Sequence, residues 1–361
     1  MKRREILTSG LGLAAAAVAR PAIAQSTPEL RWRLSSSFPP SLEIIYGAAE
    51  VFTKAVAEAS DSKFQIQLLP PGEAAEPLQA ADAVTGGSVE MCQTASYYYV
   101  GKDPTFALAT GVPFGPNSRM QNAWMYFGGG IDLMNEFYSK YNIYALPAGN
   151  TGCQMGGWFR KELKFPNELN GLKMRIGGFA GRVMQKLGVV PCQFSGSEIY
   201  AALEKGALDA AAWVSPYDDE KLGLGTVAPY YFYPAWWSGG AMLHNFINLE
   251  KWHSLTPAYQ ALLQSASEKT NVWMQAKYDA ENPAALKRLV GGNVRLKPFP
   301  PLILDACLKT SFELYNQLSA NNPGFKKVWD SILAFRNDQY LWWQLAEYSY
   351  DTYLIQTRTR T

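Results

Sequence analysis

Histidine is scarce in this chain, because only His244 and His253 occur among its 361 residues. The sequence also has no G-x-S-x-G nucleophile elbow, no P-loop, and no G-x-G-x-x-G motif that opens a helix after a strand. A Ser or Cys nucleophile paired with His244 is left open, but a packed or solvated histidine is the favoured interpretation. The sequence therefore favours a protein that is not an enzyme, with a secreted hydrolase or lyase as the alternative from another class.

Cysteine is also sparse, and the four cysteines are far apart in the sequence. They form none of the close pairs that a zinc site uses. A disulfide is compatible with an oxidising compartment, yet a chain of this size folds without one, and any pairing is left open. Small buried apolar residues are the favoured interpretation of all four, which are Cys92, Cys153, Cys192 and Cys307.

Neither charge nor hydrophobicity is concentrated in one long stretch of the mature chain. The net charge is +2, and acidic and basic residues are interspersed without a basic stripe, which argues against a nucleic-acid partner. No segment after residue 24 approaches the ~18 uninterrupted apolar residues that a membrane-spanning helix needs. What the composition does contain is aromatic side chains, at 13% of residues.

Residues 1–24 have the pattern of an export signal. The basic "KRR" precedes the apolar run "LGLAAAAVA", which is too short to span a bilayer, and Ala22-Ile23-Ala24 is a small-x-small cleavage site. Arg3 and Arg4 fit a twin-arginine signal as well as an ordinary secretory signal. We therefore expect a mature chain that begins near Gln25 and works outside the cytoplasm.

The mature chain alternates predicted strands and helices, which is the pattern of parallel α/β architecture. A first run contains the strand "LRWRLSSSF", a helix from Glu43 to Ala59 and the strand "FQIQLL". A second run begins near "IYALPAGNTG" and continues through "LKMRI". Beyond Asn248 the pattern is helical except for "NVRLKPF", a late strand that we expect to return to an earlier sheet. This order predicts two discontinuous α/β domains with a ligand cleft between them.

We expect the first domain to comprise residues 25–149 and about 240–285, and the second to comprise 150–239 and about 286–330. The last segment, 331–361, is expected to be a C-terminal helix. The C-terminal helical region has more apolar side chains than one amphipathic face can cover, so it predicts either a homodimer or packing back across both domains. These side chains are Trp329, Ile332, Phe335, Leu341, Trp342, Trp343, Leu345, Tyr348 and Tyr353.

Three polar residues stand beside turns where a ligand is able to approach the backbone. Asn150 and Gln154 lie in "AGNTGCQMGGWF", where a strand ends among glycines, and both offer amide donors and acceptors. Arg175 ends "LKMR" just before Gly177 and Gly178, and its guanidinium fits a carboxylate in a bidentate way. The structural alternatives are a plain turn residue for Asn150 and a surface ion pair for Arg175.

Two aromatic runs have the composition of ligand-pocket walls, which combine rigid apolar rings with a polar tip. One run is Tyr97 to Tyr99, and the other is Trp236-Trp237 before a glycine pair. Rows of aromatic residues are at least as often part of a core, and the residues alone do not decide between the two interpretations.

The segments "GLKMR" and "SEIYAALEKGALDA" resemble the paired signature of solute-binding proteins from tripartite ATP-independent periplasmic (TRAP) transporters. "RIGGFAGRVMQKLGVVP" and "WVSPYDDEKLGLGTVAPYYFYPAWW" are similar to the branch that binds 2-oxo acids and related monocarboxylates. The resemblance runs from about residue 31 to the C-terminus. It implies a two-domain periplasmic solute-binding-protein fold with a central inter-domain cleft and long C-terminal helices. It also implies a receptor that passes a small organic acid to a TRAP membrane permease without an enzymatic step.

The resemblance also implies roles for individual residues. Arg175 matches the family arginine that pairs with the ligand carboxylate. Asn150, Gln154, Trp213 and a tyrosine of the 97–99 run match positions that line the pocket, and we assign the tyrosine role to Tyr98 and Tyr99. Some members of the branch dimerise through the C-terminal end. A homodimer and packing back across both domains are therefore about equally favoured.

The sequence departs from this branch at two positions. In the branch, one glutamate precedes the tryptophan matching Trp213, another follows the pair matching Trp236 and Trp237, and both help to hold a cation that bridges to the ligand. Ala212 and Ser238 stand at these positions here. Ala212 has no side-chain oxygen and Ser238 has only a neutral one, whereas a hard cation needs several oxygen ligands. We therefore predict binding without a metal or other cofactor, with Ser238 donating a hydrogen bond to the ligand. The alternative ligands are an aromatic acid or a neutral amide.

Overall fold

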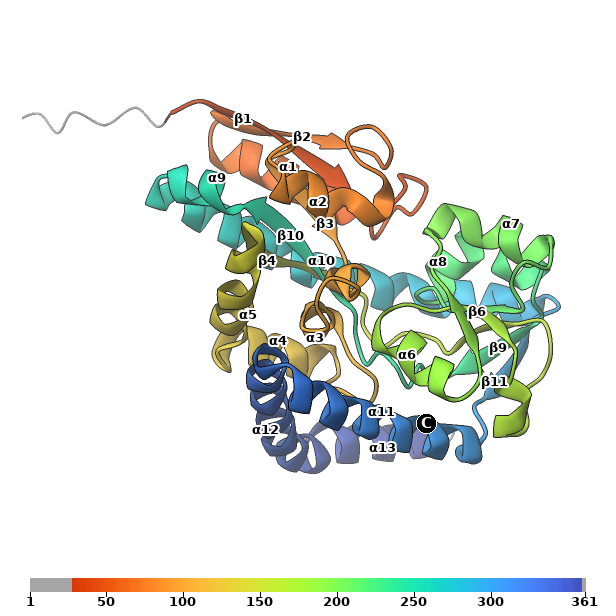
Figure 1. Cartoon of the computed structure of the whole chain (residues 1–361). Helices are drawn as coiled ribbons and strands as arrows, with labels where there is room; N and C mark the ends of the chain where they lie inside the picture. Colours follow the sequence, from red (N-terminus) through yellow and green to blue (C-terminus); the bar gives the residue numbers. More distant parts are fainter. Residues whose placement is uncertain (1–27, 359–361) are drawn as a thin grey trace, which may run out of the picture.

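The computed structural model describes residues 28–358, which form two α/β lobes with long C-terminal helices beside them (Figure 1). This arrangement confirms the predicted fold class. The expected export signal, residues 1–24, lies outside the described residues. Within the described part of the chain, no helix combines the length and the apolar character that crossing a bilayer requires.

The first lobe is built on a five-stranded sheet in the order β2-β1-β3-β10-β4. In β1, Trp32 and Leu34 are buried while Arg31 and Arg33 are exposed, because successive side chains of a strand point to opposite faces. β10 runs antiparallel to β3 and β4, whereas β1 is parallel to both of its neighbours. The strands are β1 (Leu30–Ser36), β2 (Phe64–Leu69), β3 (Met91–Thr94), β4 (Ile143–Asn150) and β10 (Met242–Asn248).

The second lobe is built on a six-stranded sheet in the order β11-β9-β5-β8-β6-β7. The late strand predicted in "NVRLKPF" is β11, and it pairs in parallel with β9, which confirms its return to an earlier sheet. The strands are β5 (Gly157–Phe159), β6 (Lys173–Arg175), β7 (Val190–Cys192), β8 (Ala210–Ala211), β9 (Tyr230–Tyr233) and β11 (Arg295–Pro298). The residue limits predicted for the two domains remain a prediction.

Helices surround both sheets, and one of them, α10, serves both lobes because it packs on α1 and β4 of the first lobe and on α8 of the second. The helix predicted from Glu43 begins only at Gly47, since residues 43–46 form turns. The helices are α1 (Gly47–Ala59), α2 (Ala80–Thr85), α3 (Phe106–Thr110), α4 (Ser118–Phe127), α5 (Gly130–Tyr138), α6 (Gly178–Lys186), α7 (Ile199–Glu204), α8 (Pro216–Lys221), α9 (Leu249–Ser254), α10 (Pro257–Gly291), α11 (Pro301–Asn321), α12 (Pro323–Leu345) and α13 (Glu347–Thr357).

Two segments that connect the lobes, 151–156 after β4 and 234–241 before β10, pair with each other through their backbones. The Thr151 amide donates to the Ala241 carbonyl at 3.1 Å, and the Gln154 amide donates to the Ser238 carbonyl at 3.3 Å. The Ala235 amide in turn donates to the Gln154 carbonyl at 3.3 Å. We call these two paired segments the crossing segments.

The sequence left open whether the C-terminal helices pack back onto the molecule or form a homodimer. In the structure, one part of them packs back and another part exposes apolar side chains. α11 packs on α6 of the second lobe, and α12 packs on α4 and α5 of the first. Trp329 and Ile332, in the first half of α12, are therefore buried by packing back onto the molecule. Beyond them the apolar side chains lie on the surface: Leu341, Trp342, Leu345, Tyr348 and Tyr353 are each more than half exposed.

All four cysteines are free. Cys92 and Cys307 are buried, as expected for small apolar residues. The expectation is wrong for Cys153, which is exposed, and for Cys192, which is half-buried. Cys153 lies in a crossing segment, and Cys192 ends β7 at the edge of the second sheet, so neither position is covered on all sides.

Candidate functional site

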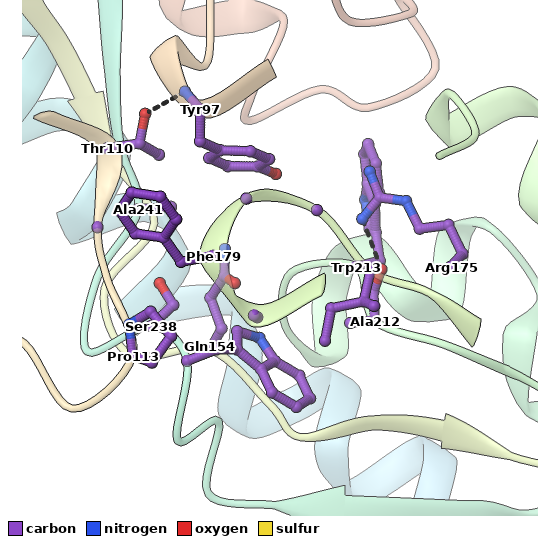
Figure 2. A pocket seen from close by; sticks show the side chains of 16 residues that line it. Tyr97, Thr110, Pro113, Gln154, Arg175, Phe179, Ala212, Trp213, Ser238 and Ala241 are labelled. Carbon is purple, nitrogen blue, oxygen red and sulfur yellow. Dashed lines mark hydrogen bonds between the residues drawn. The ribbon is translucent and has the colours of Figure 1, made fainter. Parts of the chain in front are cut away.

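A pocket whose space, open solvent included, is about 430 Å³ lies where the two lobes meet the crossing segments (Figure 2). The first lobe contributes Tyr97, Thr110, Gly111 and Pro113; the second contributes Ile176 to Ala180 with Arg175, Ala212 and Trp213; the crossing segments contribute Gln154, Trp237, Ser238 and Ala241. A smaller pocket of about 280 Å³ adjoins it, since the two share Tyr97, Gln154, Trp213 and Ala241. The lining combines aromatic rings with polar groups, as small-molecule sites often do, and the rings are those of Tyr97, Phe179, Trp213 and Trp237.

Arg175 is buried at this pocket, where the sequence pattern predicted a strand-end cation. It is the last residue of β6, and the parallel register places it beside Cys192 of β7 and Ala211 of β8. Its Nε donates to the Phe194 carbonyl at 3.2 Å, and its Nη1 donates to the Ala212 carbonyl at 2.7 Å. Two main-chain oxygens therefore fix the plane of the guanidinium.

The Arg175 cation has no carboxylate partner among the described residues. No ion pair joins it to an acid, and the described residues that line the pocket include no Asp or Glu. Its guanidinium carbon lies 4.8 Å from the centre of the Trp213 ring, whose face attracts the cation without neutralising it. Because a buried charge is costly unless it is paired, the remaining N–H groups of Arg175 are suited to an anionic ligand.

The first turn of α6 adds backbone donors to the same wall. Gly177, Gly178, Phe179 and Ala180 line the pocket, and no side chain caps this helix end. Gly178 has φ of +60°, a conformation that favours glycine. The free N–H groups and the positive end of the helix dipole favour a negative charge, in the same direction as Arg175.

Two buried donors at the pocket have no hydrogen-bond partner among the described residues. They are the indole Nε1 of Trp213 and the hydroxyl of Ser238. Gln154 lines the same pocket, and its Nε2 donates to Thr151 Oγ1 at 3.3 Å, which leaves its side-chain oxygen for other contacts. An unpartnered buried polar group is costly, so these donors are suited to acceptor atoms of a ligand or to ordered water.

The tyrosine run 97–99 is divided between pocket and core. Tyr97 lines the main pocket, and Tyr98 lines the adjoining one. Burial raises the pKa of Tyr98 well above its ordinary value, and the nearby cation of Arg175 opposes that rise. Tyr99 points into the first lobe instead, where its hydroxyl accepts from the Ala81 amide at 2.9 Å. Tyr99 therefore does not line either pocket.

Asn150 likewise lies outside the pocket lining. It is fully buried at the end of β4, where its Nδ2 donates to Gln121 Oε1 at 3.2 Å and its Oδ1 accepts from the Gly152 amide at 3.0 Å. Both ends of the amide are used to hold the start of a crossing segment. The structure thus brings Arg175, Gln154, Trp213, Ser238 and Tyr98 together and leaves Asn150 and Tyr99 behind the wall.

Residues 35–322 match the family of bacterial extracellular solute-binding proteins, family 7. The chain belongs to this family. It is 43% identical over 364 residues, 98% of this chain and 99% of the relative, to a monocarboxylate 2-oxoacid-binding periplasmic protein of Nostoc sp. (strain PCC 7120). The family is one of extracytoplasmic receptors that bind a solute.

Two solved structures of TRAP transporter solute-binding proteins superpose closely on this family 7 protein. The one from Bordetella bronchiseptica RB50 has a TM-score of 0.91 and 45% identity over 92% of this chain and 99% of its own; it is a mixed occupancy dimer with copurified calcium and picolinate. The one from Pseudoalteromonas atlantica T6c has a TM-score of 0.87 and 36% identity over 89% and 98%, with bound sodium and pyruvate.

The residues of this family 7 protein do not fit the bridging cation that the resemblance implied. No described residue lining the pocket is an Asp, Glu, His or Cys, and no group of three such side chains elsewhere in the described chain is arranged to hold a metal. The carbonyl of Ala212, one of the changed positions, already accepts from Arg175. Gln154 and Ser238 offer only neutral side-chain oxygens, fewer than the six to eight ligands that calcium takes.

Neither histidine of the family 7 protein lines the pocket. His244 is buried in β10 between β3 and β4, with Tyr138 and Phe246 beside its ring. Burial lowers the pKa of His244 to about 3. The packed-histidine interpretation is confirmed for His244, whereas His253 is exposed at the end of α9.

Several lining residues were not among the predicted site residues. Tyr97 belongs to a run that the sequence marked, so only the choice within that run was missed, and Trp237 belongs to a pair that was also marked. Phe179 follows the glycine turn after Arg175 and has an apolar helical pattern that looks like core. Thr110 and Pro113 have no signal in the sequence, because the fold alone brings the end of α3 and the loop after it to the pocket.

Proposed function

We propose that this protein is a periplasmic receptor that binds a small 2-oxo acid or related monocarboxylate and delivers it to a TRAP membrane permease. The observation that carries the proposal is the buried Arg175 guanidinium, fixed by two carbonyls and left without an acid partner in the pocket. The ligands recorded for two relatives, pyruvate and picolinate, are both monocarboxylates, which supports the same ligand class here.

The ligand carboxylate pairs with Arg175 and faces the first turn of α6. Closure between the lobes excludes water, which strengthens this pairing because the effective dielectric falls. A neutral amide ligand is not favoured, since it leaves the buried Arg175 charge uncompensated. An aromatic acid remains a second candidate, because the rings of Tyr97, Trp213 and Trp237 line the pocket and are suited to packing on a flat ligand.

We infer that the ligand binds without a bridging metal. With Ala212 and Ser238 in place of two glutamates, one arginine faces one carboxylate and the charge in the pocket is balanced. Ser238 and the Trp213 indole then donate to the second polar group of the ligand, such as the oxo oxygen of a 2-oxo acid. These donors take the place of a metal that would otherwise coordinate that group.

We also infer that the ligand leaves unchanged. Turnover by a hydrolase or lyase requires a nucleophile or a general acid-base pair at the ligand, and the described pocket residues offer neither a carboxylate nor an imidazole. Mass spectrometry of ligand recovered after prolonged incubation tests this inference. A product whose amount rises in proportion to the concentration of this protein would contradict it.

Titration calorimetry with pyruvate and picolinate tests the proposal as a whole. The parent protein is expected to bind at least one of them, and Arg175→Met is expected to lose about 30-fold to several thousandfold in affinity. Arg160→Met, which removes an exposed arginine outside the pocket, is the matched control and should bind as the parent does. Equal affinity of Arg175→Met and the parent would show that Arg175 is not the anchor.

A further inference from the structure

The short helix α8 is rigidly tied to the ligand-binding wall. It follows directly after residues 212–214, the segment that holds Arg175 and carries Trp213. The Asp219 carboxylate accepts from the Val214 amide at 3.1 Å through one oxygen. Through its other oxygen it accepts from Trp158 Nε1 at 2.8 Å and from the Tyr231 hydroxyl at 2.7 Å. Any displacement of α8 is therefore transmitted to the pocket wall.

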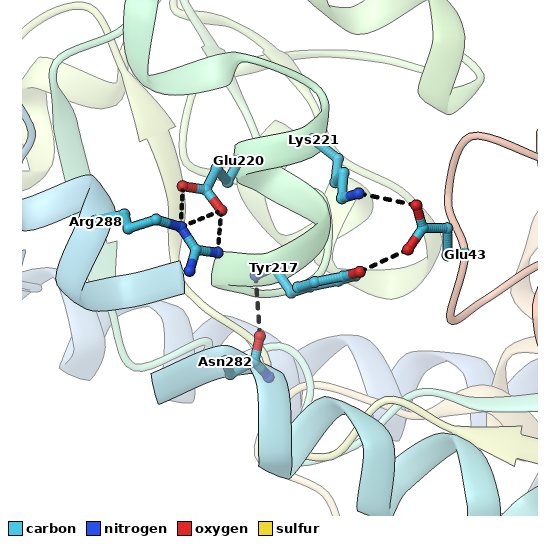
Figure 3. Close-up of polar contacts among 6 residues, drawn as sticks. All are labelled: Glu43, Tyr217, Glu220, Lys221, Asn282 and Arg288. Atoms are coloured by element: carbon cyan, nitrogen blue, oxygen red, sulfur yellow. Dashed lines mark hydrogen bonds and ion pairs between the residues drawn. The ribbon is translucent and has the colours of Figure 1, made fainter. Parts of the chain in front are cut away.

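The same helix is also fastened to α10. The Tyr278 hydroxyl donates to Asp218 at 2.6 Å, and the Asn282 side chain accepts from the backbone amide of Tyr217 at 3.0 Å (Figure 3). Glu220 forms a two-pronged ion pair with Arg288, with Nε and Nη2 donating at 2.9 and 2.6 Å (Figure 3). α8 thus presents its outer side chains from a fixed base.

Two of those outer side chains reach across to the first lobe and meet one carboxylate. The Tyr217 hydroxyl donates to Glu43 Oε2 at 2.8 Å, and Lys221 Nζ donates to Glu43 Oε1 at 2.9 Å (Figure 3). Glu43 lies in the turns before α1 and lines neither pocket. The hydrogen bond from Lys221, followed by that from Tyr217, holds the pKa of Glu43 below its ordinary value.

We propose that Glu43, Tyr217 and Lys221 form an interlobe clasp that sets ligand affinity without touching the ligand. The proposal rests on the proposed function in one respect, that the ligand binds between the lobes. When the lobes are together, the clasp joins the turn before α1 to a helix that Asp219 ties to the binding wall. Loss of the clasp lowers the population of the closed arrangement, and the apparent affinity falls with that population.

The expected size of the effect is modest. Glu43 and Lys221 are both well exposed, at 59% and 39% of their side-chain surface, so solvent screens their attraction. We expect Glu43→Gln to weaken ligand binding by about 3- to 10-fold. The signature that separates the clasp from a pocket residue is that this factor is the same for every ligand, because only the closing equilibrium changes.

The experiment measures the affinities of pyruvate and picolinate for the parent, Glu43→Gln and a matched control, Glu58→Gln. Glu58 is an exposed glutamate of the same lobe whose partner, Lys54, lies on the same helix at 3.8 Å. Glu43→Gln is expected to weaken both ligands by one common factor and Glu58→Gln neither. The charge exchange Glu43→Lys with Lys221→Glu is expected to recover most of the affinity that Glu43→Lys alone loses.

Two results would overturn the clasp. One is a Glu43→Gln affinity equal to that of the Glu58→Gln control, and the other is a factor that differs between the two ligands. If the parent binds neither ligand, the proposed function fails but the clasp is still decided by small-angle X-ray scattering of the unliganded proteins. Glu43→Lys places a second cation opposite Lys221, so this variant should show a larger radius of gyration than Glu58→Lys. Equal radii reject the proposal.

Discussion

The ring of Tyr97 packs against the backbone of Gly177 from the opposite lobe, so closely that a Cβ atom added at Gly177 would lie 2.6 Å from Cε2 of the ring. The contact leaves no room for a side chain when the lobes are together. Gly177 has φ of −100° and ψ of 177°, which alanine adopts without strain. The need for glycine here is therefore one of space between the lobes rather than of backbone conformation.

Gly177→Ala is accordingly expected to fold normally and to bind its ligand about 5- to 150-fold more weakly, since overpacking of this size costs about 1 to 3 kcal/mol. Calorimetry with pyruvate or picolinate measures the loss, and thermal melting checks the fold. Gly101→Ala is the control, because a Cβ there meets nothing within 4 Å. An unchanged affinity would mean that the ligand-bound lobes do not approach as closely as Tyr97 and Gly177 do here.

Removal of metal ions is expected to leave ligand affinity within about twofold of its value in sodium- or calcium-containing buffer. The physical reason is the absence of a carboxylate among the described lining residues. The measurement is a titration after exhaustive chelation in sodium-free buffer. Affinity that collapses there and returns with added Na⁺ or Ca²⁺ would refute metal-free binding.

A gain-of-function variant sharpens the same test. Ala212→Glu combined with Ser238→Glu places two carboxylates at the pocket and is expected to make binding depend on calcium. The two single variants are expected to bind poorly with or without calcium, because each adds one buried charge that nothing balances. A double variant that binds equally well with and without calcium argues against these positions as the place where a cation is gained or lost.

The buried acids of α8 are expected to give this protein an unusual dependence of stability on pH. Burial raises the pKa of Asp218 from 3.8 to about 7, and one of its oxygens has no partner among the described residues. Between these two values the folded protein holds a proton that the unfolded chain has released. This contribution to stability is therefore complete below about pH 3.8 and is lost as the pH rises through about 7.

His244 acts in the opposite direction over part of the same range. Its pKa is lowered from 6.5 to about 3, so its contribution is present above 6.5 and lost as the pH falls. The measurement is therefore the difference in Tm between the parent and Asp218→Asn, in which the His244 term cancels. The parent is expected to lose about 3 °C or more relative to the variant between about pH 5 and pH 8. Parallel Tm profiles would show that Asp218 does not titrate in this range.

The exposed apolar side chains of α12 and α13 are expected to form a homodimer interface. Leu341, Trp342 and Leu345 are 69%, 61% and 78% exposed, and the relative from Bordetella bronchiseptica is a dimer. Light scattering is expected to give twice the mass of one chain at micromolar concentration. The double variant Trp342→Ser with Leu345→Ser is expected to have the mass of one chain and unchanged ligand affinity. Leu302→Ser, an exposed leucine of α11, is the control. A parent protein with the mass of one chain would rule out the dimer.

Much of the fold was predictable because its signals are local. The alternation in "FQIQLL" matches β2 residue for residue, and the late strand predicted in "NVRLKPF" is β11. The start of α1 was not predictable from periodicity, since Ile44 and Ile45 have helical spacing with Ala48 but lie in turns that pack into the core. Apolar spacing identifies a buried side chain without specifying the backbone that buries it.

The site was predictable where one residue combines a charge with a special backbone position. Arg175 stood out for that reason, as a cation at a strand end before two glycines. Asn150 has the same kind of position, but its amide is consumed by Gln121 and Gly152, contacts that no local pattern reveals. Thr110, which ends α3, and Pro113 reach the pocket because the loop after α3 is bonded to a crossing segment, with the Phe114 amide donating to the Trp236 carbonyl at 2.8 Å.

Two main-chain atoms, the carbonyls of Phe194 and Ala212, accept hydrogen bonds from Arg175, while the Trp213 ring lies against its guanidinium. Every amino acid provides the same carbonyl, so the orientation of Arg175 does not depend on which side chain occupies position 212. Recognition of the carboxylate and selection among carboxylates are thus separable in this protein. Substitutions at positions 212 and 238 are free to diversify the ligand over evolutionary time, while the group that captures its acid end stays where the backbone places it.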